Sequence, residues 1–166
     1  MAGNHLYVCG GLLENDFVTK AERFDTVENK WEEIANMRQK RGYAFGVATE
    51  GKIFVAGGRE NWESCLKTCE MFNISTNEWQ LIGSLTVHRV CGSMMCLKGT
   101  LYVLGGLDDK YRSQLCVECY DPTEDKWIKK TTIPVKMISI GHNERFTGCV
   151  LKLSKGVLDK LDVIKE

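Results

Sequence analysis

Cysteine and histidine are considered first, because a set of these side chains at suitable spacing could hold a metal ion. The chain has eight cysteines and three histidines. Cys116 and Cys119 form a C-x-x-C sequence, but the segment around them is predicted to be a strand, on which residues three apart point to opposite faces. The histidines share no spacing that would place a ligand set. The sequence therefore predicts no metal site and no cofactor, and we expect the cysteines to be reduced thiols that behave as small hydrophobic residues.

Glutamates that recur at a fixed interval are the next candidates for chemistry. Pairs of carboxylates do the acid–base and nucleophilic work in glycosidases. Arg41 and Arg89 recur at the same interval, and an arginine beside a buried glutamate would neutralise it through charge-assisted hydrogen bonds. A residue repeated in every unit is better explained by structure than by catalysis, so we predict ion pairs and no catalytic residue. The recurring glutamates are Glu22, Glu70 and Glu118.

The glutamates belong to a repeat of about 48 residues that covers most of the chain. In each unit an apolar run ends in a glycine pair, an aromatic residue followed by Asp or Asn comes next, and a tryptophan lies seven residues after the aromatic. We expect the tryptophans to pack between neighbouring units, because they bury a large area. The repeated glycines and tryptophans are Gly10, Gly11, Trp31, Gly57, Gly58, Trp79, Gly105, Gly106 and Trp127.

Each unit is predicted to contain four short strands. In the second unit these strands are expected at 43–49, 53–57, 67–73 and 77–82, where short apolar or alternating segments are separated by polar turns. No segment before residue 150 keeps a helical period over several turns. Four-stranded units repeated at this interval are typical of β-propeller blades. The predicted fold is therefore all-β, a partial propeller of about three antiparallel blades.

These features together resemble the kelch repeat, over about residues 5–138, and the segment 117–122 is similar to kelch-like proteins that carry BTB and BACK domains upstream. The resemblance implies a module that binds a protein client, as in the recognition propellers of adaptors for cullin-RING ubiquitin ligases. Recruitment of a ligase would then depend on BTB and BACK domains, which these 166 residues do not contain. An alternative is a scaffold that binds cytoskeletal (actin-type) or other structural partners. A copper enzyme similar to galactose oxidase is not expected, because the tyrosines and histidines show no ligand pattern.

The repeat divides the chain into three blade-sized units and a tail. The first unit is expected to be incomplete, because no inner strand fits before the first glycine pair. The arginine position of the repeat falls on Met137 in the third unit, and no glycine pair follows it. Since propellers have about four to eight blades, we expect a fragment, a short isoform or one half of an assembly. The predicted units are 1–41, 42–89 and 90–137, followed by a divergent tail at 138–166 with a candidate closing strand at 146–153.

Composition limits the partners and the compartment. Twenty-two basic and 22 acidic side chains give a formal net charge of zero, which argues against nucleic acid or an anionic membrane as a partner. No apolar run is long enough to span a membrane, and the first residues lack the basic and apolar regions of a secretory signal. Together with the expected free thiols, these features favour a reducing, cytoplasmic location.

Residues outside the repeat pattern are the candidates for partner binding, because packing of the repeat does not dictate them. The loop after each glycine pair is polar but carries an aromatic residue, and two of the three loops also carry an arginine. We expect these loops on one face of the array, with Trp62, Tyr111 and Arg112 as anchors, since Trp, Tyr and Arg are enriched at binding hot spots. Against this, any exposed loop carries some residues of these types. The predicted partner-binding residues are Asn15, Phe17, Tyr43, Arg59, Asn61, Trp62, Tyr111 and Arg112.

Overall fold

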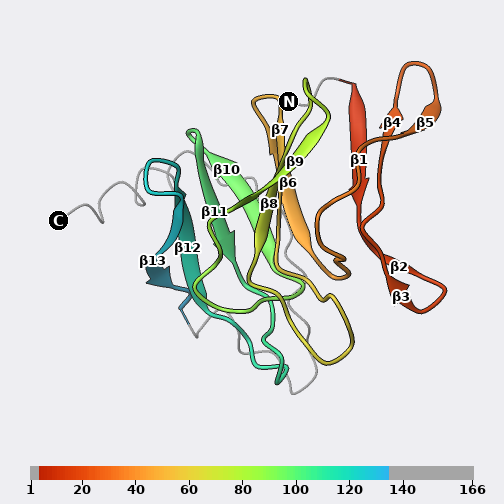
Figure 1. Ribbon diagram of the computed structural model, residues 1–166. Coiled ribbons are helices and arrows are strands. Elements are labelled where there is room, and N and C mark those ends of the chain that lie inside the picture. The colour runs from red at the N-terminus through yellow and green to blue at the C-terminus, as the bar shows by residue number, and fades with distance from the viewer. Residues whose placement is uncertain (1–3, 135–166) are drawn as a thin grey trace.

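The computed structural model describes residues 4–134, and all regular secondary structure in this range is β-strand. Three antiparallel sheets stand side by side, and the chain passes through them in order (Figure 1). The predicted all-β fold of antiparallel, four-stranded blades is confirmed. The tail predicted at 138–166 and its candidate closing strand lie outside the described residues.

The first sheet, called blade 1, has three strands. They are β1 (His5–Cys9), β4 (Ala21–Asp25) and β5 (Lys30–Glu33), paired in the order β1-β4-β5. A short hairpin of β2 (Leu12–Leu13) and β3 (Asp16–Phe17) projects from the connection between β1 and β4. The inner strand that begins each of the other two sheets has no counterpart in blade 1 among the described residues.

The second and third sheets, called blades 2 and 3, are complete four-stranded sheets. The strands of blade 2 are β6 (Phe45–Thr49), β7 (Lys52–Ala56), β8 (Cys69–Asn73) and β9 (Glu78–Ile82). The strands of blade 3 are β10 (Ser93–Leu97), β11 (Thr100–Leu104), β12 (Cys116–Asp121) and β13 (Lys126–Thr132). Strands that follow one another in the chain pair antiparallel, and the inner strands β6 and β10 lie in contact. Each blade is thus a simple meander that exposes its turns at two opposite edges.

The Asp or Asn of each repeat closes the hairpin between the two outer strands. The side-chain oxygen of Asn73 accepts hydrogen bonds from the backbone N–H groups of Ser75 and Thr76, and Asp25 and Asp121 act in the same way. This arrangement is an Asx turn. It sets the register in which the repeated aromatic residue faces the tryptophan of the next strand, with ring centres 5.0–5.3 Å apart.

The glycine pair ties each of the first two blades to the linker that follows it. The N–H of Gly58 donates to the carbonyl oxygen of Arg89 at 2.9 Å. Gly57 has a φ of 60°, and a Cβ atom there would lie 2.2 Å from the same oxygen, so a larger residue would displace the linker. The N–H of Gly11 contacts the carbonyl oxygen of Arg41 at 2.8 Å in the same way. The recurrence of the pair is therefore explained by close approach of the backbone.

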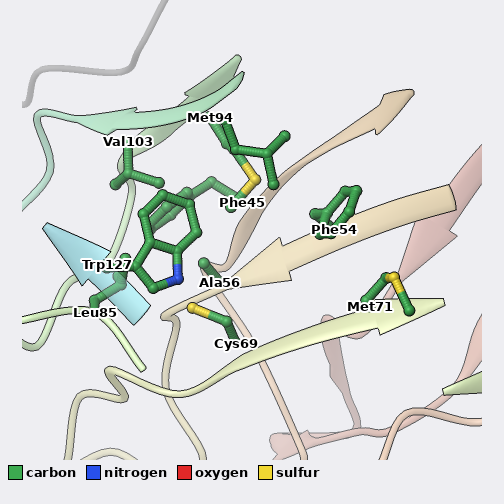
Figure 2. Close-up of a cluster of buried hydrophobic side chains, with 10 residues drawn as sticks. Phe45, Phe54, Ala56, Cys69, Met71, Leu85, Met94, Val103 and Trp127 are labelled. Carbon is green, nitrogen blue, oxygen red and sulfur yellow. The ribbon is translucent and has the colours of Figure 1, made fainter. Parts of the chain in front are cut away.

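The hydrophobic core lies between the blades. Figure 2 shows the cluster between blades 2 and 3, where Trp127 lies among side chains of both sheets, including Phe45 and Met94. A second cluster, between blades 1 and 2, contains Trp79. Blade 2 contributes one face to the junction with blade 1 and its other face to the junction with blade 3, so the repeat position of a residue indicates what it packs against.

Trp31 is an exception to the prediction that all three repeated tryptophans pack between blades. Its side chain is 54% exposed, whereas Trp79 and Trp127 are each 4% exposed. Trp79 packs against blade 1 and Trp127 against blade 2, so the equivalent neighbour of Trp31 would stand before blade 1. No sheet in the described part of the chain covers that face. Trp31 therefore occupies the repeat position without the packing that the position has elsewhere.

Candidate partner-binding rim

Three loops lie along one edge of the array, the lower edge in Figure 1. They are the β2–β3 hairpin, the loop at 58–68 and the loop at 106–115, and each comes at the glycine pair that follows β1, β7 or β11. Equivalent positions of a repeat array fall on the same edge, because each blade repeats the path of the one before it. We call these three loops, together with Tyr43 of the first linker, the rim.

Aromatic side chains from two blades form the centre of the rim. The ring centre of Trp62 lies 5.0 Å from that of Phe17 and 6.5 Å from that of Tyr43. Trp62 and Tyr43 are 56% and 50% exposed and present apolar surface to solvent. Phe17 is only 1% exposed, which corrects its prediction as a contact residue, because it supports the exposed rings from below. Gly42 permits this packing, since a Cβ atom there would lie 2.2 Å from the Phe17 ring.

Arg59 connects the Trp62 loop to the next loop. The residue is buried, and its Nη1 group donates to the carbonyl oxygen of Trp62 at 2.7 Å. Its guanidinium carbon lies 5.5 Å from the ring centre of Tyr111, which is within the range of a cation–π interaction. An isolated β-bridge to Gly42 holds its backbone. The prediction that Arg59 itself contacts a partner is therefore corrected: its side chain is used to position Trp62 and Tyr111.

The third loop of the rim is organised by Asp108, which sequence reasoning missed. Its carboxylate accepts hydrogen bonds from the N–H groups of Lys110 and Arg112, both at 2.9 Å, and from Arg112 Nε at 2.7 Å. Desolvation raises the pKa of Asp108, but the hydrogen bonds from Arg112 and Lys110 together outweigh it and hold the pKa below its ordinary value. The carboxylate is thus ionised at neutral pH. The available signal was an Asp placed where an Asx turn can form.

The remaining rim residues differ in what they offer to a partner. Tyr111 is 71% exposed, and the side chain of Arg112 is 69% exposed. Only Nε of Arg112 is engaged within the described residues, so the outer part of its guanidinium fork faces solvent. Asn61 accepts hydrogen bonds from two N–H groups of its own loop, and Asn15 lies in the turn of the β2–β3 hairpin with a left-handed φ of 69°. Both asparagines are exposed, and both shape the backbone of their loops.

The repeated arginines Arg41 and Arg89 form buried ion pairs with two of the repeated glutamates. Arg41 Nε lies 3.0 Å from Glu70 Oε1, and Arg89 Nη2 lies 2.8 Å from Glu118 Oε1, with all four side chains fully buried. Backbone N–H groups of the linkers donate to both glutamates as well. Carboxylates enclosed in this way cannot reach a substrate. Glu22, at the same repeat position in blade 1, is partly exposed and has no ion pair among residues 4–134.

Cysteines and other potential ligands do not gather into a metal site in the part of the chain that the structure describes. No group of three or more His, Cys, Asp or Glu side chains is placed to hold a metal ion there. The seven cysteines of this part have free thiols. Burial raises the pKa of Cys9 and of Cys69 to about 12, so both thiols stay protonated at neutral pH. The same residues contain no helix that could cross a membrane.

The sequence matches a known repeat and several proteins that contain it. Residues 2–38, 40–86 and 88–133 match the Kelch motif. Kelch-like protein 33 of Homo sapiens is 34% identical over 76 residues, which are 44% of this chain and 14% of that protein. Kelch-like protein 25 of Mus musculus is 33% identical over 136 residues, 82% of this chain and 15% of that protein. Kelch repeat protein C2 of Vaccinia virus (strain Western Reserve) is 29% identical over 144 residues, 79% of this chain and 26% of that protein.

The fold is similar to a solved structure titled "Structure of YjhT", with a TM-score of 0.67 at 18% sequence identity. The similar region covers 79% of this chain and 49% of that chain. The chain thus spans 14–26% of the length of the three relatives above and about half of the solved one. Kelch repeats are typically non-catalytic and mediate protein binding. With three matched motifs on successive antiparallel sheets, the chain belongs to the kelch-repeat family and is a protein-binding module of that family.

Proposed function

We propose that the chain binds a protein client through the rim, as the client-recognition part of a ubiquitin-ligase adaptor of the kelch-like type. The observation that carries this proposal is the exposure of Trp62, Tyr111 and Arg112 on one edge of the array. Trp62 and Tyr43 lie together at the centre of the rim, and contiguous exposed apolar patches mark sites of interaction. Trp, Tyr and Arg are also the residue types that dominate binding energy at protein interfaces.

The rim is held in place before any partner arrives. Arg59 fixes the backbone of Trp62 and lies against Tyr111, and Asp108 fixes both the backbone and the Nε group of Arg112. Phe17 supports Trp62 from below. Side chains that are already ordered lose less conformational entropy on association. The supporting residues therefore favour a rim that acts as one rigid, composite contact surface.

The proposed role in a ubiquitin ligase is supported by the proteins to which the chain is similar. Two of them are kelch-like proteins, and the chain covers only about one seventh of the length of either. Recruitment of a cullin-RING ligase would be a task of BTB and BACK domains outside these 166 residues. In this role the kelch module contributes selectivity by holding the client, and catalysis takes place on other proteins.

Client binding is tested by comparing the wild-type chain with a triple variant, W62A/Y111A/R112A. Proteins that the wild-type chain retains from cells are identified by mass spectrometry, purified and titrated against both chains. Each single truncation is expected to weaken client binding by about 1–3 kcal/mol without changing the free energy of unfolding. Val27→Ala is the matched control, because Val27 is 68% exposed in the turn between β4 and β5, at the opposite edge. Equal affinity of the wild-type and triple-variant chains for every purified client would overturn the rim assignment.

The adaptor role and the scaffold alternative differ in what happens to the client. Silencing the protein in cells that express it should lengthen the half-life of an adaptor's client, and only while cullin ligases are active. A client half-life that is the same with and without the protein, combined with a cytoskeletal client such as actin, would favour the scaffold. Rim-dependent binding would then stand while the ligase role would fall.

A further inference from the structure

Two half-exposed aromatic rings at the centre of the rim are set at an angle to each other. The planes of Trp62 and Tyr43 are tilted by 60°, and the ring centres lie 6.5 Å apart. Phe17 lies beneath them, with its ring centre 5.0 Å from that of Trp62 and 6.2 Å from that of Tyr43. We call the rings of Trp62 and Tyr43 the aromatic corner. A side chain that enters the corner contacts both rings at once.

Rings arranged in this way favour a cation over an anion, because the face of an aromatic ring carries negative partial charge. A lysine or arginine side chain is attracted when its charged group lies within about 6 Å of the ring centre, and aromatic cages for quaternary ammonium groups use the same attraction. The rim already contains one contact of this kind, between the Arg59 guanidinium and the ring of Tyr111. The aromatic corner is therefore chemically suited to a cationic side chain.

The loops around the aromatic corner also carry carboxylates without a counter-charge. Glu60 and Glu63 flank Trp62 in its loop, and Glu14 lies in the turn of the β2–β3 hairpin, whose Phe17 packs against Trp62. All three glutamates are exposed, and none makes an ion pair within residues 4–134. Charges of one sign on neighbouring loops produce a field that attracts the opposite sign. This part of the rim therefore favours a positively charged partner.

Basic side chains of the chain itself are engaged in other contacts near the corner. Lys40 Nζ pairs with Asp16 Oδ2 at 2.7 Å, and the buried Arg59 donates to the carbonyl oxygen of Trp62. Neither Trp62 nor Tyr43 has a cation over its ring among the residues that the structure describes. The corner is thus open to a cation from another molecule. The other basic residues of the rim are Lys67, Lys110 and Arg112.

We propose that the aromatic corner binds an arginine or lysine side chain of the client, which Glu14, Glu60 and Glu63 attract to it. The inference rests on the proposed function, because it assumes that the client contacts the rim, and it adds the chemistry of the segment presented there. The methylene groups of such a side chain pack on aromatic rings while its charged end stays in water near the carboxylates. The net charge of the whole chain is zero, so a basic segment would be held by this local surface and not by a general attraction.

Titration of the full 166-residue chain with three designed peptides tests the proposal. The first peptide has arginines separated by Gly-Ser pairs, the second has lysines in their place, and the third has citrulline, which keeps the shape of arginine without its charge. The chemical shift of the Trp62 indole N–H, identified by its absence in Trp62→Phe, reports binding. We expect the better of the two cationic peptides to bind at least about tenfold more tightly than the citrulline peptide.

A charge-neutralising pair of substitutions tests the carboxylates. Glu60→Gln combined with Glu63→Gln should weaken binding of the cationic peptide about fivefold, and the weakening should shrink as salt is added. Glu28→Gln combined with Glu78→Gln is the matched control, because it removes the same charge from exposed positions at the opposite edge. The control variant is expected to bind the peptide as the wild-type chain does. All four glutamates are exposed, so neither variant should affect folding.

Failure of this inference can be told apart from failure of the proposed function. Equal binding of the arginine, lysine and citrulline peptides, or no binding of any of them, would overturn the cation assignment. Equal weakening in the two double variants would show attraction to the overall charge and would overturn the role of the corner. In each case the loss of clients by W62A/Y111A/R112A could still support the rim as a contact surface. Retention of every client by that triple variant would overturn the proposed function, and it is measured without the peptides.

Discussion

The junction between blades 1 and 2 and the junction between blades 2 and 3 use the same repeat positions but complete them differently. Arg41 at the first junction donates to Glu70, to backbone carbonyl oxygens and to the side chains of Gln39 and Thr68. Arg89 at the second junction pairs with its own glutamate and with backbone oxygens, but its Nε group has no acceptor in the described residues. Arg89 Nε has no acceptor there because Glu118 accepts from Nη2, whereas Glu70 accepts from Nε of Arg41.

Two substitutions between the repeats explain the side-chain acceptors that the Nη groups of Arg89 lack. Val87 stands where the first junction has Gln39, and Cys116 stands where it has Thr68. An amide and a hydroxyl are strong acceptors, whereas a valine offers none and a thiol only a weak one. The repeat therefore specifies the ion pair, and residues between the repeated positions decide how fully the arginine is satisfied.

The apolar parts of the two junctions also differ, and here the second junction is the more extensive. The buried cluster of the second junction contains Phe45, Phe54 and Met94 as well as Trp127 (Figure 2), while the cluster around Trp79 in the first junction has fewer buried residues. The indole N–H of Trp79 donates to the carbonyl oxygen of Ala35 at 2.6 Å, whereas that of Trp127 has no oxygen or nitrogen acceptor among residues 4–134 and is close only to the weakly accepting thiol of Cys69. The first junction relies more on hydrogen bonds and the second more on apolar burial.

The largest effect is expected from removing an arginine. Arg41→Ala leaves Glu70 charged and buried without its partner, and such losses cost about 3–5 kcal/mol of unfolding free energy. Arg89→Ala should cost less, because Arg89 makes fewer side-chain hydrogen bonds. Urea denaturation of the full chain measures both. Lys40→Ala is the control, since its pair with Asp16 is exposed and should contribute only about 0–1 kcal/mol. An equal or larger loss for Arg89→Ala would break the distinction between the junctions.

A smaller effect separates the two buried tryptophans. Phenylalanine at either position removes the same atoms, but Trp79→Phe also removes the hydrogen bond to Ala35. Trp79→Phe is therefore expected to cost about 1 kcal/mol more than the same change at Trp127. The difference between the two unfolding free energies isolates this contribution, because the loss of volume is shared. A larger loss at Trp127 would show that apolar contact in the second junction outweighs the hydrogen bond in the first.

The parts of the fold that sequence could predict are those in which one contact is repeated. The glycine pair, the Asx turn and the strand order follow from local sequence in each unit, so three copies of a pattern identify them. The exposure of Trp31 could not be predicted in this way, because burial depends on a neighbouring blade and not on the unit itself. Blade 1 has the repeated tryptophan at the same position as blade 2, but no sheet stands before it among those that the structure describes.

The rim was less predictable, because loop side chains follow no period. Their placement on one edge follows from the repeat, but the direction of each side chain does not. Phe17 is buried because Gly42 leaves room for its ring, and Arg59 is buried because its backbone bridges to that glycine. Contacts of this kind join residues from different repeats. A single sequence gives no sign of them.

The smallest predicted effect is the pH dependence of one polar contact, which has a titrating acceptor in the second junction only. Asp125 and Asn77 make equivalent contacts across the two junctions, but only the aspartate titrates. Hydrogen bonds from the Tyr120 hydroxyl, at 2.6 Å, and from the Gly83 N–H lower the pKa of Asp125 below its ordinary value. A carboxyl group with a lowered pKa in the folded state stabilises the fold above its unfolded pKa of about 3.9. That contribution is lost as the pH falls through the folded pKa.

Nuclear magnetic resonance can follow this titration, with the first junction as an internal control. The amide of Gly83 donates to Asp125, so its chemical shift should change with a midpoint below about 3.9, whereas the amide of Ala35, which donates to Asn77, should not follow the same curve. Asp125→Asn should abolish the titration at Gly83 and reduce the fall in melting temperature on acidification. A midpoint at Gly83 above the unfolded value would mean that the contact disfavours the carboxylate. The second junction would then gain stability from protonation, which is the reverse of the sign that its hydrogen bonds predict.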